Sequence, residues 1–525
     1  MKRIDLTAIL LLAAATMVGC DTEGLYETTI DVGEAVTLAK GVVIHERSQD
    51  RLVYLEASKT KAVLKELYRA EDDERLVWSK AGPDPKNPTQ LFEMSVPKDE
   101  RDVDSTETLL RIRVDGTVDS FEVNSLFSKL AFGPLHRFAV LYHDPEKETE
   151  SDLYNPNEVA IVDLSKKPSE SNPRLLSIDL KEQNISGVSF LPELTVAGVK
   201  RQFAVFLGQG QIRLVDLIDP NLASAGLRLV HKGDQRTVSP LQLLIRNEDG
   251  TRETMVFVRA VGSEDVYAIS LTASDNSEHA FMATLNQLEA GGEPLDMALV
   301  QDGDNPLLTV LSRAAGNVLL NVINVDTADA FTVNVDDTVS RVLLREVDGA
   351  EEVVLFGDDT SGIHFLKADG LGEERGRNLE HLLIPDRVQR ALPLDEARLL
   401  IVPGNEQDLV LLDLDTRDST RLISPFTMDL SGAQMNGDLF FCVPEDKDRV
   451  NVVDMRTGHP DSLLLDDRIS SLHLLKGSNV GVALHDTPTG RVTVFPLSAH
   501  PTREEANVLD GLWLDGFLDE EEVSR

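Results

Sequence analysis

Short runs of alternating apolar and polar residues, each ending in Asp-Leu or an equivalent pair, recur along most of this 525-residue chain. The clearest copies begin at Val159, Ile212, Leu409 and Val450, and looser copies begin at 266, 320, 363 and 492. A second apolar run and a polar turn precede each copy. Two such runs joined by a turn with Gly, Asp, Asn or Pro predict a β-hairpin with a packing face. We therefore expect eight hairpins between residues 137 and 500.

The spacing of these hairpins indicates how they pack. The Asp-equivalent positions lie on average about 48 residues apart, the size of one propeller blade. Shorter apolar pieces, such as those at 174 and 461, would complete three or four strands per unit. Solenoid repeats are usually shorter and more regular, and a β-sandwich would not repeat one phrase eight times. The pattern therefore predicts an all-β fold with a single β-propeller, which leaves only short, protected sheet edges.

The number of blades depends on the chain ends. Residues 28–125 are strand-rich but less regular: the segments 74–80, 91–96 and 108–114 form one more unit, and 41–57 adds another hairpin. Closed propellers commonly combine strands from both termini in one blade. We therefore expect eight blades, with seven or nine as alternatives. The run 508–518 is expected to be a closing edge strand that buries Trp513, with a partner-binding peptide as the alternative.

The repeated phrase resembles those of the YVTN/WD40-like propeller superfamily over about residues 137–500. The Trp-Asp and Gly-His pairs of regular WD40 repeats are absent from these phrases, so a regular WD40 assignment is not supported. The resemblance therefore implies the fold and no particular activity.

The amino-terminal twenty residues have the pattern of an export signal. Residues 2 and 3 are basic, 6–18 are apolar, and Gly19 precedes Cys20. The apolar run is shorter than the roughly 20 residues that span a bilayer as a helix. The segment resembles a bacterial lipoprotein signal peptide, whose lipobox is matched by Met17-Val18-Gly19-Cys20. The resemblance implies cleavage before Cys20, a diacylglyceryl thioether on it, and a place in the bacterial envelope on the inner or the outer membrane.

An ordinary secretory signal, cut near Ala15, is the alternative. With lipidation we expect a signal peptide at 1–19, the lipidated cysteine and its tether at 20–29, the propeller at 30–518 and an acidic tail at 519–525. Residues 21–29 would reach at most about 30 Å when extended, so the body would stay close to its membrane.

The net charge of the chain disfavours some classes of binding partner. The sequence has 51 Lys and Arg against 90 Asp and Glu, a formal charge of -39. Nucleic-acid binding is disfavoured because it depends on clustered cations, and so is adhesion to anionic lipid headgroups. The membrane contact should therefore come from the lipid at Cys20 alone, and the acidity is explained by solubility. Cys442, the other of two cysteines, lies in an apolar run and is predicted to be a buried, inert thiol.

Two loops are candidates for binding. The segment 144–158 lengthens one hairpin loop, and Tyr154, flanked by Asn155 and Asn157, is its aromatic residue. Loops on rigid scaffolds often carry binding, so these residues form a candidate partner-binding loop, with a merely solvated loop as the alternative. The acidic turns at 245–250, 301–305 and 347–352 resemble degenerate FG-GAP repeats, and Asp302 and Asp304 are the best calcium candidates. Calcium needs six to eight converging oxygens, so ordinary turn chemistry is favoured.

Sequence motifs for catalysis are absent. The eleven histidines include no H-x-H or H-E-x-x-H grouping, and the chain contains no G-x-S-x-G elbow and no complete dinucleotide-binding glycine motif. We therefore expect no cofactor and a non-catalytic scaffold that binds an envelope protein. The alternatives are a hydrolase or lyase whose site is assembled across blades in the central funnel, and a calcium-binding sensor.

Overall fold

A computed structural model describes residues 32–509, apart from 59–61, 85–87, 99–105, 144–154, 171–172, 179–184, 197–198, 209, 221–224, 232–237, 248–252, 274–280, 303–304, 336–337, 369–370, 372–378, 385–386, 395, 404–407, 424–427, 445 and 488–489. Regular structure within this part is β-strand, with single 3-10 turns at Arg47–Gln49 and Pro168–Glu170. None of the helices in this part is long and apolar enough to cross a membrane.

The strands form ten four-stranded antiparallel sheets, which we number as blades in chain order. Blades 1 to 5 consist of β1 (Val32–Leu38), β2 (Gly41–Glu46), β3 (Arg51–Ala57) and β4 (Ala62–Arg69); β5 (Glu74–Ala81), β6 (Gln90–Pro97), β7 (Thr108–Arg113) and β8 (Val118–Glu122); β9 (Lys129–Phe132), β10 (Phe138–Tyr142), β11 (Glu158–Asp163) and β12 (Arg174–Ser177); β13 (Ile185–Phe190), β16 (Phe203–Gly208), β17 (Gln211–Asp216) and β18 (Ala225–Arg228); and β19 (Ser239–Asn247), β20 (Glu253–Val261), β21 (Asp265–Ala273) and β22 (Phe281–Glu289).

Blades 6 to 10 consist of β23 (Glu293–Asp302), β24 (Asn305–Ala314), β25 (Asn317–Asn324) and β26 (Ala330–Val335); β27 (Arg341–Val347), β28 (Ala350–Phe356), β29 (Gly362–Lys367) and β30 (Glu380–Leu383); β31 (Val388–Pro393), β32 (Arg398–Pro403), β33 (Asp408–Asp413) and β34 (Ser419–Ile423); β35 (Met428–Asn436), β36 (Leu439–Pro444), β37 (Arg449–Asp454) and β38 (His459–Leu464); and β39 (Ile469–Leu475), β40 (Val480–His485), β41 (Val492–Pro496) and β42 (Asn507–Leu509). A short hairpin, β14 (Leu194–Val196) with β15 (Val199–Arg201), is inserted between the first two strands of blade 4.

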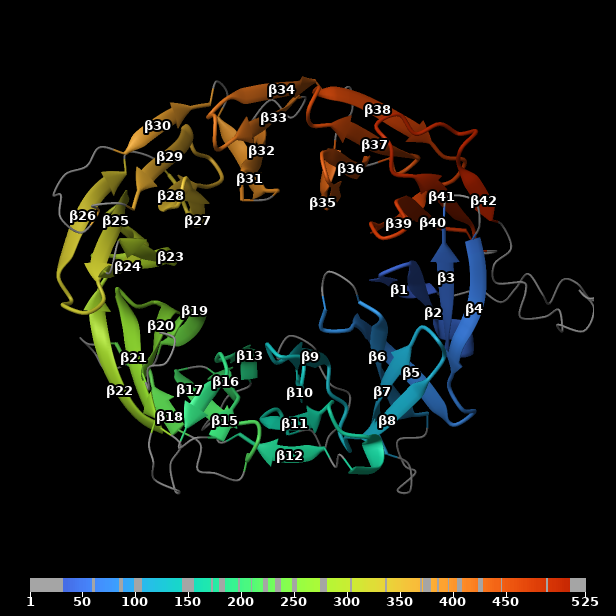
Figure 1. Ribbon diagram of the computed structural model, residues 1–525, viewed down its shortest axis with the longest axis horizontal. Coiled ribbons are helices and arrows are strands. Elements are labelled where there is room, and N and C mark those ends of the chain that lie inside the picture. The colour runs from blue at the N-terminus through green and yellow to red at the C-terminus, as the bar shows by residue number, and fades with distance from the viewer. Residues whose placement is uncertain are drawn as a thin grey trace, which may run out of the picture.

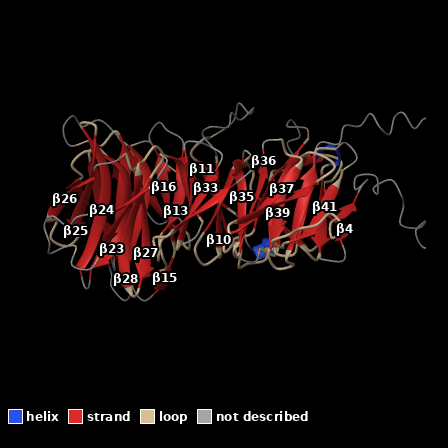
Figure 2. Cartoon of the chain, turned by 90° about the horizontal axis from the view of Figure 1, so that it is seen from above, coloured by secondary structure: helices blue, strands red, loops and turns tan. Residues whose placement is uncertain are grey.

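The blades are arranged radially in a closed ring, so the chain is a single ten-bladed β-propeller (Figure 1). In each blade the first strand lies toward the centre of the ring and the fourth at its rim. Seen from the side, the ring is a flat disc with the strands running through its thickness (Figure 2). The expectation of an all-β propeller is confirmed, but the expectation of eight blades, with seven or nine as alternatives, is wrong.

The wrong blade number has a definite cause. The eight hairpins recognised in the sequence are the second and third strands of blades 3 to 10, and the two amino-terminal units are separate blades. No strand is exchanged between the chain ends in the described part: blade 1 is built from residues 32–69 and blade 10 from residues 469–509. The run that begins at Val508 enters β42, the outermost strand of blade 10, and its remainder with Trp513 lies outside the described residues.

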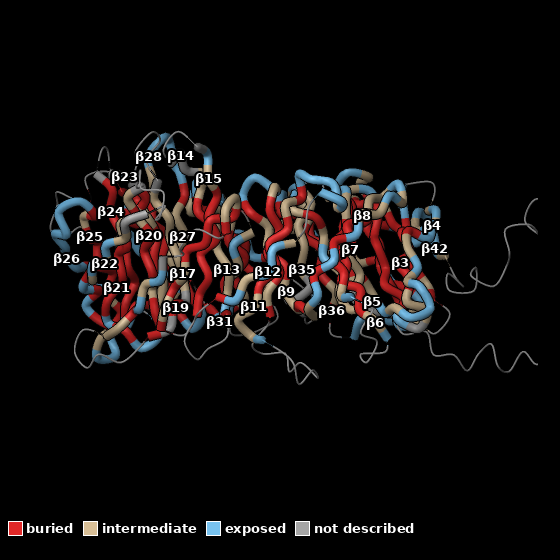
Figure 3. Tube along the Cα trace, turned by 90° about the horizontal axis from the view of Figure 1, so that it is seen from below, coloured by how far each residue is buried: buried red, intermediate tan, exposed pale blue. Residues whose placement is uncertain are grey.

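The hydrophobic core is divided into ten clusters, one between each pair of neighbouring blades. In β16, Phe203 and Val205 pack toward blade 5, whereas Ala204 and Phe206 pack toward blade 3. Both faces of the middle strands are therefore buried (Figure 3). This burial explains why these strands read as nearly continuous apolar runs, as fully covered strands do.

The ring closes by the same kind of packing. Ile44 and Leu55 of blade 1 form one cluster with Val480 and Val482 of blade 10. The turns of the two blades also approach closely, since a Cβ atom added to Gly477 would lie 2.9 Å from the carbonyl oxygen of Ala39. Face-to-face packing therefore replaces strand exchange at the seam.

Polar side chains on the innermost strands add bonds between neighbouring blades. The Gln434 amide in β35 donates to the Leu472 carbonyl at 2.6 Å and accepts from the Leu474 N–H at 3.3 Å, both in β39. Asp296 in β23 accepts from the Val342 N–H in β27 at 2.8 Å. At the seam, Thr37 Oγ1 in β1 lies 2.8 Å from Nδ1 of His473 in β39. Gln434 and Asp296 thus satisfy backbone groups that face a neighbouring blade and have no partner in a sheet, whereas Thr37 and His473 pair through their side chains.

The Asp of the repeated Asp-Leu phrase stabilises the turn that follows the third strand. The side-chain oxygen of the Asp or Asn that ends the third strand accepts backbone N–H bonds from the following turn at Asp163, Asp216, Asn324, Asp413 and Asp454. The next residue is buried and extends the ladder, as when the Leu414 N–H donates to the Ala397 carbonyl at 2.7 Å. These Asx turns all lie on one face of the disc, because antiparallel strands place the first and third connections of a blade at the same end. We call this side the Asx-turn face.

The seam predicts a pH dependence of stability. Burial lowers the pKa of His473 from 6.5 to about 4. As the pH falls, His473 becomes protonated near pH 6.5 in the unfolded chain but only near pH 4 in the folded chain. The corresponding stabilisation, about 3 kcal/mol, is complete above pH 6.5 and is lost progressively down to pH 4. His473→Gln should remove that part of the pH dependence, measured as the free energy of unfolding between pH 7 and pH 4.

An unchanged profile for His473→Gln would contradict the assignment of a neutral histidine to the seam.

Candidate binding site

The predicted site residues do not assemble into one site within the described structure. Cys20, Tyr154 and Asp304 lie outside the described residues. Asn155 and Asn157 stand just before β11, on the face opposite the Asx-turn face. Oδ1 of Asn155 accepts from the Asn157 N–H at 3.1 Å, and the Asn157 carbonyl accepts from the Ile178 N–H at 2.8 Å. These two residues thus form an Asx turn at the end of the loop, and their role in binding stays a prediction.

The acidic turns form hairpin connections where the structure describes them. Asp302 pairs with Asn305 at the end of the β23–β24 hairpin. At the next such turn, Asp348 and Gly349 have φ values of 54° and 80°, the pair of left-handed conformations that two-residue hairpins require. Among the described residues, no group of three or more His, Cys, Asp or Glu side chains is arranged to hold a metal ion.

Buried titratable groups occur at separate blade interfaces. Burial lowers the pKa of His143 in blade 3 to about 4, as it does for His473 at the seam. In blade 2, burial raises the pKa of Glu93 well above its ordinary value, although Ser79 donates a hydrogen bond to this carboxyl. Cys442 is buried between blades 8 and 9 beside Leu400 and Phe440. These groups lie in different blade interfaces, so they form no common reaction centre.

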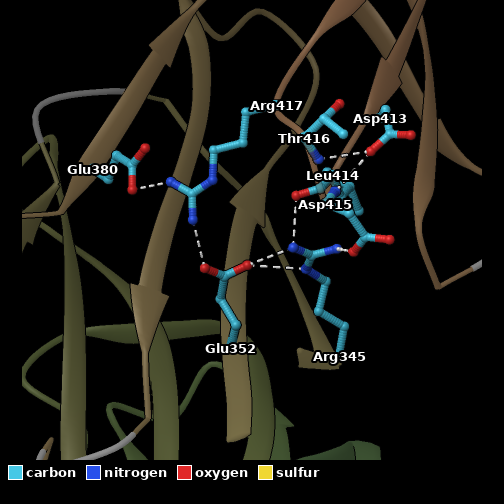
Figure 4. A network of polar contacts seen from close by, with 8 residues as sticks. All are labelled: Arg345, Glu352, Glu380, Asp413, Leu414, Asp415, Thr416 and Arg417. Carbon is cyan, nitrogen blue, oxygen red and sulfur yellow. Dashed lines mark hydrogen bonds and ion pairs between the residues drawn. The ribbon is translucent and has the colours of Figure 1, made fainter. Parts of the chain in front are cut away.

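A dense ionic network joins blades 7 and 8 on the Asx-turn face (Figure 4). The buried carboxylate of Glu352 in β28 accepts from Arg345 Nε at 2.9 Å and from Arg417 Nη2 at 2.7 Å. Arg345 also donates to the Leu414 carbonyl at 2.6 Å and to Asp415 at 2.7 Å, both in blade 8. Arg417, which pairs with Glu380 as well, lies 4.2 Å from the centre of the Phe365 ring. All of these charges are engaged with one another, so the network locks two blades together.

A second arginine makes the same type of bond between blades 2 and 3. Arg111 Nη1 donates to the Leu164 carbonyl at 2.8 Å, while its Nε and Nη2 are held by Asp119. Leu164 and Leu414 occupy the same place in the repeated phrase. An arginine from the preceding blade thus satisfies a carbonyl at the point where the third strand ends.

Between blades 3 and 4, the Asx-turn face has an open cavity of about 260 Å³ instead. Its charged walls are Arg137, Asp163, Lys166, Glu170 and Arg174, all from blade 3. Arg137 Nη2 lies 3.1 Å and Lys166 Nζ 3.8 Å from Asp163 Oδ2. Burial alone would raise the pKa of Asp163, but hydrogen bonds from Arg137 and Ser165 hold it below its ordinary value. Asp163 is therefore ionised and fixes the position of the Arg137 guanidinium.

The apolar part of this cavity comes from both blades: Phe138 and Ile161 from blade 3, and Leu217 and Ile218 from blade 4. The Arg137 guanidinium carbon lies 4.8 Å from the centre of the Phe138 ring. Ile218 is positioned by the Asx turn of blade 4, in which Asp216 accepts its N–H at 2.8 Å. Because Phe138, Ile161 and Leu217 are only 2–3% exposed, the accessible surface of the cavity comes mainly from its charged side chains.

The register of the sheets shows how this interface differs from the one between blades 7 and 8. In blade 7, Arg345 pairs with Glu352, and Glu352 pairs with Lys367, the Asp-equivalent position of its third strand. In blade 3 the equivalent residues are Gly133 and Phe138: the Gly133 N–H donates to the Phe138 carbonyl, and Phe138 pairs with Asp163. Blade 3 thus lacks both the arginine and the carboxylate that lock blades 7 and 8.

The inserted hairpin stands beside the cavity on the same face, because it connects the first and second strands of blade 4. Arg201 in β15 forms an ion pair with Asp216, whose turn presents Ile218 to the cavity. Motif searching did not identify this site, because its cations are spread over a strand entry, a turn and an outer strand. Alignment of the blades on the repeated Asp does not reveal it either, because blade 4 also has apolar residues, Leu191 and Phe203, where blade 7 has the ion pair.

Comparison with known proteins leaves the family open. No protein-family model matches the sequence, and no curated protein matches it. The similar solved structures include the dihydro-heme d1 dehydrogenase NirN in complex with DHE, with 14% identity, a TM-score of 0.40, and coverage of 74% of this chain and 78% of that chain.

Two further similar structures are the Dos1 propeller and a Porphyromonas gingivalis peptidase. The Dos1 propeller has 14% identity and a TM-score of 0.39, with coverage of 72% of this chain and 93% of that chain. The P. gingivalis dipeptidyl peptidase 4 has 10% identity and a TM-score of 0.41, with coverage of 90% and 66%. At such low identities and TM-scores these likenesses carry no argument about binding or catalysis.

The network in Figure 4 predicts unequal effects of removing its two glutamates. Glu352→Gln removes the buried carboxylate that Arg345 and Arg417 share and leaves Arg345 only the exposed Asp415 as an anionic partner. We therefore expect a loss of about 3–5 kcal/mol in the free energy of unfolding. Glu380→Gln removes a partner whose side chain is 60% exposed, so the loss should be about 0–1 kcal/mol. Chemical unfolding of both variants measures the difference, and equal losses would contradict a buried lock.

Proposed function

We propose that this chain is a lipid-anchored propeller of the bacterial envelope that acts as a non-catalytic scaffold for a protein partner. The observation that supports it best is the cavity between blades 3 and 4 on the Asx-turn face, beside the inserted hairpin. The described ionic networks and buried titratable groups, in contrast, are used to hold blades together. A recess on one face of a rigid ring gives a partner a fixed place to bind.

The charge of the chain is compatible with this proposal. At a formal charge of -39 the body disfavours contact with nucleic acids and with anionic headgroups. Attachment is therefore assigned to the lipid on Cys20, which leaves the protein surface available for a partner. Neither the hydrolase or lyase alternative nor the calcium-sensor alternative is favoured by a specific arrangement of the described residues.

Site-specific crosslinking in the native envelope tests the scaffold. A photoreactive residue at the exposed Lys167, in the turn beside the cavity, should yield one recurrent protein adduct identified by mass spectrometry. The same residue at the exposed Asn155 samples the opposite face. Recurrent adducts from position 155 alone would move the partner to the predicted loop beside Tyr154. Failure of any protein to recur from either position would contradict the scaffold.

Replacement of the anchor cysteine tests the lipid. In a bacterium that processes lipoproteins, Cys20→Ser should move the protein from the membrane to the soluble fraction with an unchanged melting temperature. Cys442→Ala replaces the other of the two cysteines and should leave the protein in the membrane fraction. A Cys20→Ser protein that stayed with the membrane would contradict lipid anchoring at this residue.

A further inference from the structure

We propose that the free edge of β22, the outer strand of blade 5, binds an extended segment of a protein partner as an added strand. This inference rests on the proposed function, because the partner would supply that segment. The observations that carry it are the length and composition of β22, the direction of its backbone groups and the polarity of its two faces.

β22 differs from the outer strands of the other blades. It has nine residues, whereas the others have three to eight. It contains no Lys, Arg or Pro, its ladder with β21 has no bulge, and its one charged residue is Glu289 at the end. The next longest outer strand, β4, contains Lys65 and Arg69 and has a bulge, and the uncharged β26 has only six residues. Sheet edges are commonly protected by short strands, charges, proline or bulges, so the edge of β22 is open to pairing.

The ladder with β21 determines which backbone groups of β22 point outward. The N–H of Ala290, directly after β22, donates to the Glu264 carbonyl at 3.2 Å. Hydrogen-bonded and non-hydrogen-bonded pairs alternate in an antiparallel ladder, so the even-numbered residues of β22 bond to β21. The odd-numbered residues, with Ala283, Leu285 and Gln287 at the centre, therefore turn their N–H and C=O groups outward.

This outward edge selects a polypeptide. No other strand in the described part of the chain pairs with it, and it lies at the rim of the ring (Figure 1). Its donors and acceptors alternate at the spacing of an extended backbone, which another extended backbone matches group by group. Addition of a strand to an open sheet edge is one of the recurring modes of peptide recognition, in which the main chain provides the affinity.

The two faces of β22 indicate the side chains that such a segment needs. Ala283 and Leu285 are half-buried and pack, like Leu227 of β18, against the core between blades 4 and 5. Thr284 and Asn286, on the other face of the strand, are exposed. Because side chains of an added strand alternate between the same two faces, a segment with apolar residues at every second position and polar residues between them fits this edge.

β22 is also held in place before a partner binds. Every residue of the strand pairs with a residue of β21, and the Gln287 side chain donates to the Val230 carbonyl at 2.8 Å. Binding therefore orders only the incoming segment, which favours affinity.

The charge of the chain favours a partner over a second copy. At a formal charge of -39, two copies repel each other. A segment whose polar residues are uncharged or basic meets no such repulsion, so we expect that composition in the partner.

The experiment uses the full chain and the peptide acetyl-Thr-Val-Lys-Val-Thr-Val-Lys-Val-Thr-amide. The control peptide has the same sequence with N-methyl groups on two adjacent central residues, which point to opposite edges of an extended strand and obstruct both. Isothermal titration should show the unmodified peptide binding at least about 10-fold more tightly, as expected for the loss of one or more backbone hydrogen bonds.

Proline substitution tests the same edge on the protein. The Ala283 N–H points outward, so Ala283→Pro removes no ladder bond with β21, but it deletes a donor and places a ring at the edge. It should weaken peptide binding about 10-fold or more with a nearly unchanged melting temperature. Ala330→Pro in β26 is the matched control and should bind the peptide like wild type. The Asn324 N–H bonds to the Asp329 carbonyl, so the same alternation turns the Ala330 N–H outward.

Several outcomes would overturn the inference. Equal binding of the two peptides, absence of binding by either, or equal effects of the two proline variants would each refute pairing at β22. If Ala283→Pro failed to fold, the comparison of the two peptides on the wild-type chain would still decide the question. Sedimentation that showed a wild-type dimer dissociated by Ala283→Pro would refute the partner segment and assign the edge to a second copy.

The crosslinking experiment separates this inference from the proposed function. A partner adduct at position 167 or 155 that forms with unchanged yield in Ala283→Pro would refute strand addition and leave the scaffold in place. Peptide binding without any recurrent protein adduct would refute the scaffold and leave strand addition in place.

Discussion

The structure depends on face-to-face packing between neighbouring blades. Because the middle strands are covered on both faces, no blade can complete its core without a neighbour on each side. Ten blades meet this condition with ten interfaces, and the last of them joins the two ends of the described chain. In many rings a shared strand makes this junction. Here the junction relies on apolar faces and on the bond between Thr37 and His473, so closure has the same physical basis as every other interface.

This mode of packing also explains where the buried polar groups lie. Apolar side chains cover the faces of the blades. The turns and the innermost strands, however, have backbone N–H and C=O groups that face the neighbouring blade, which has no strand to pair with them. Gln434 and Arg345 meet this need with side-chain donors and acceptors that reach backbone atoms of the next blade. The buried charged and polar groups of the ring therefore mainly stabilise contacts between blades. A shifted pKa of a buried histidine or carboxyl in this ring is for that reason weak evidence for catalysis.

The sequence was sufficient for the architecture of a blade and insufficient for the ring. Alternation and the repeated Asp identified eight hairpins because each hairpin buries both of its strands. The predicted blade number was wrong because local sequence does not determine how the two chain ends meet. The units at 41–57 and 74–114 were visible, but whether they share a blade with the carboxyl-terminal strands depends on tertiary contacts. The cavity was missed for a related reason, since Arg137 and Arg174 are 37 positions apart and line the same cavity only in the folded sheet.

The contrast between two equivalent interfaces shows how a binding site can arise in such a repeat. In blade 7, Arg345 reaches the Leu414 carbonyl of the next blade and Glu352 neutralises it, so the space at the turn is filled. In blade 3, glycine and phenylalanine stand at these two positions, and the turn region has an open cavity lined mainly by charged side chains. The Asx turn that orders both interfaces is unchanged, so the rigid frame persists where the lock is absent. Equivalent interfaces of one ring can thus carry an ionic lock in one place and an open recess in another, while the packing of the blades holds both.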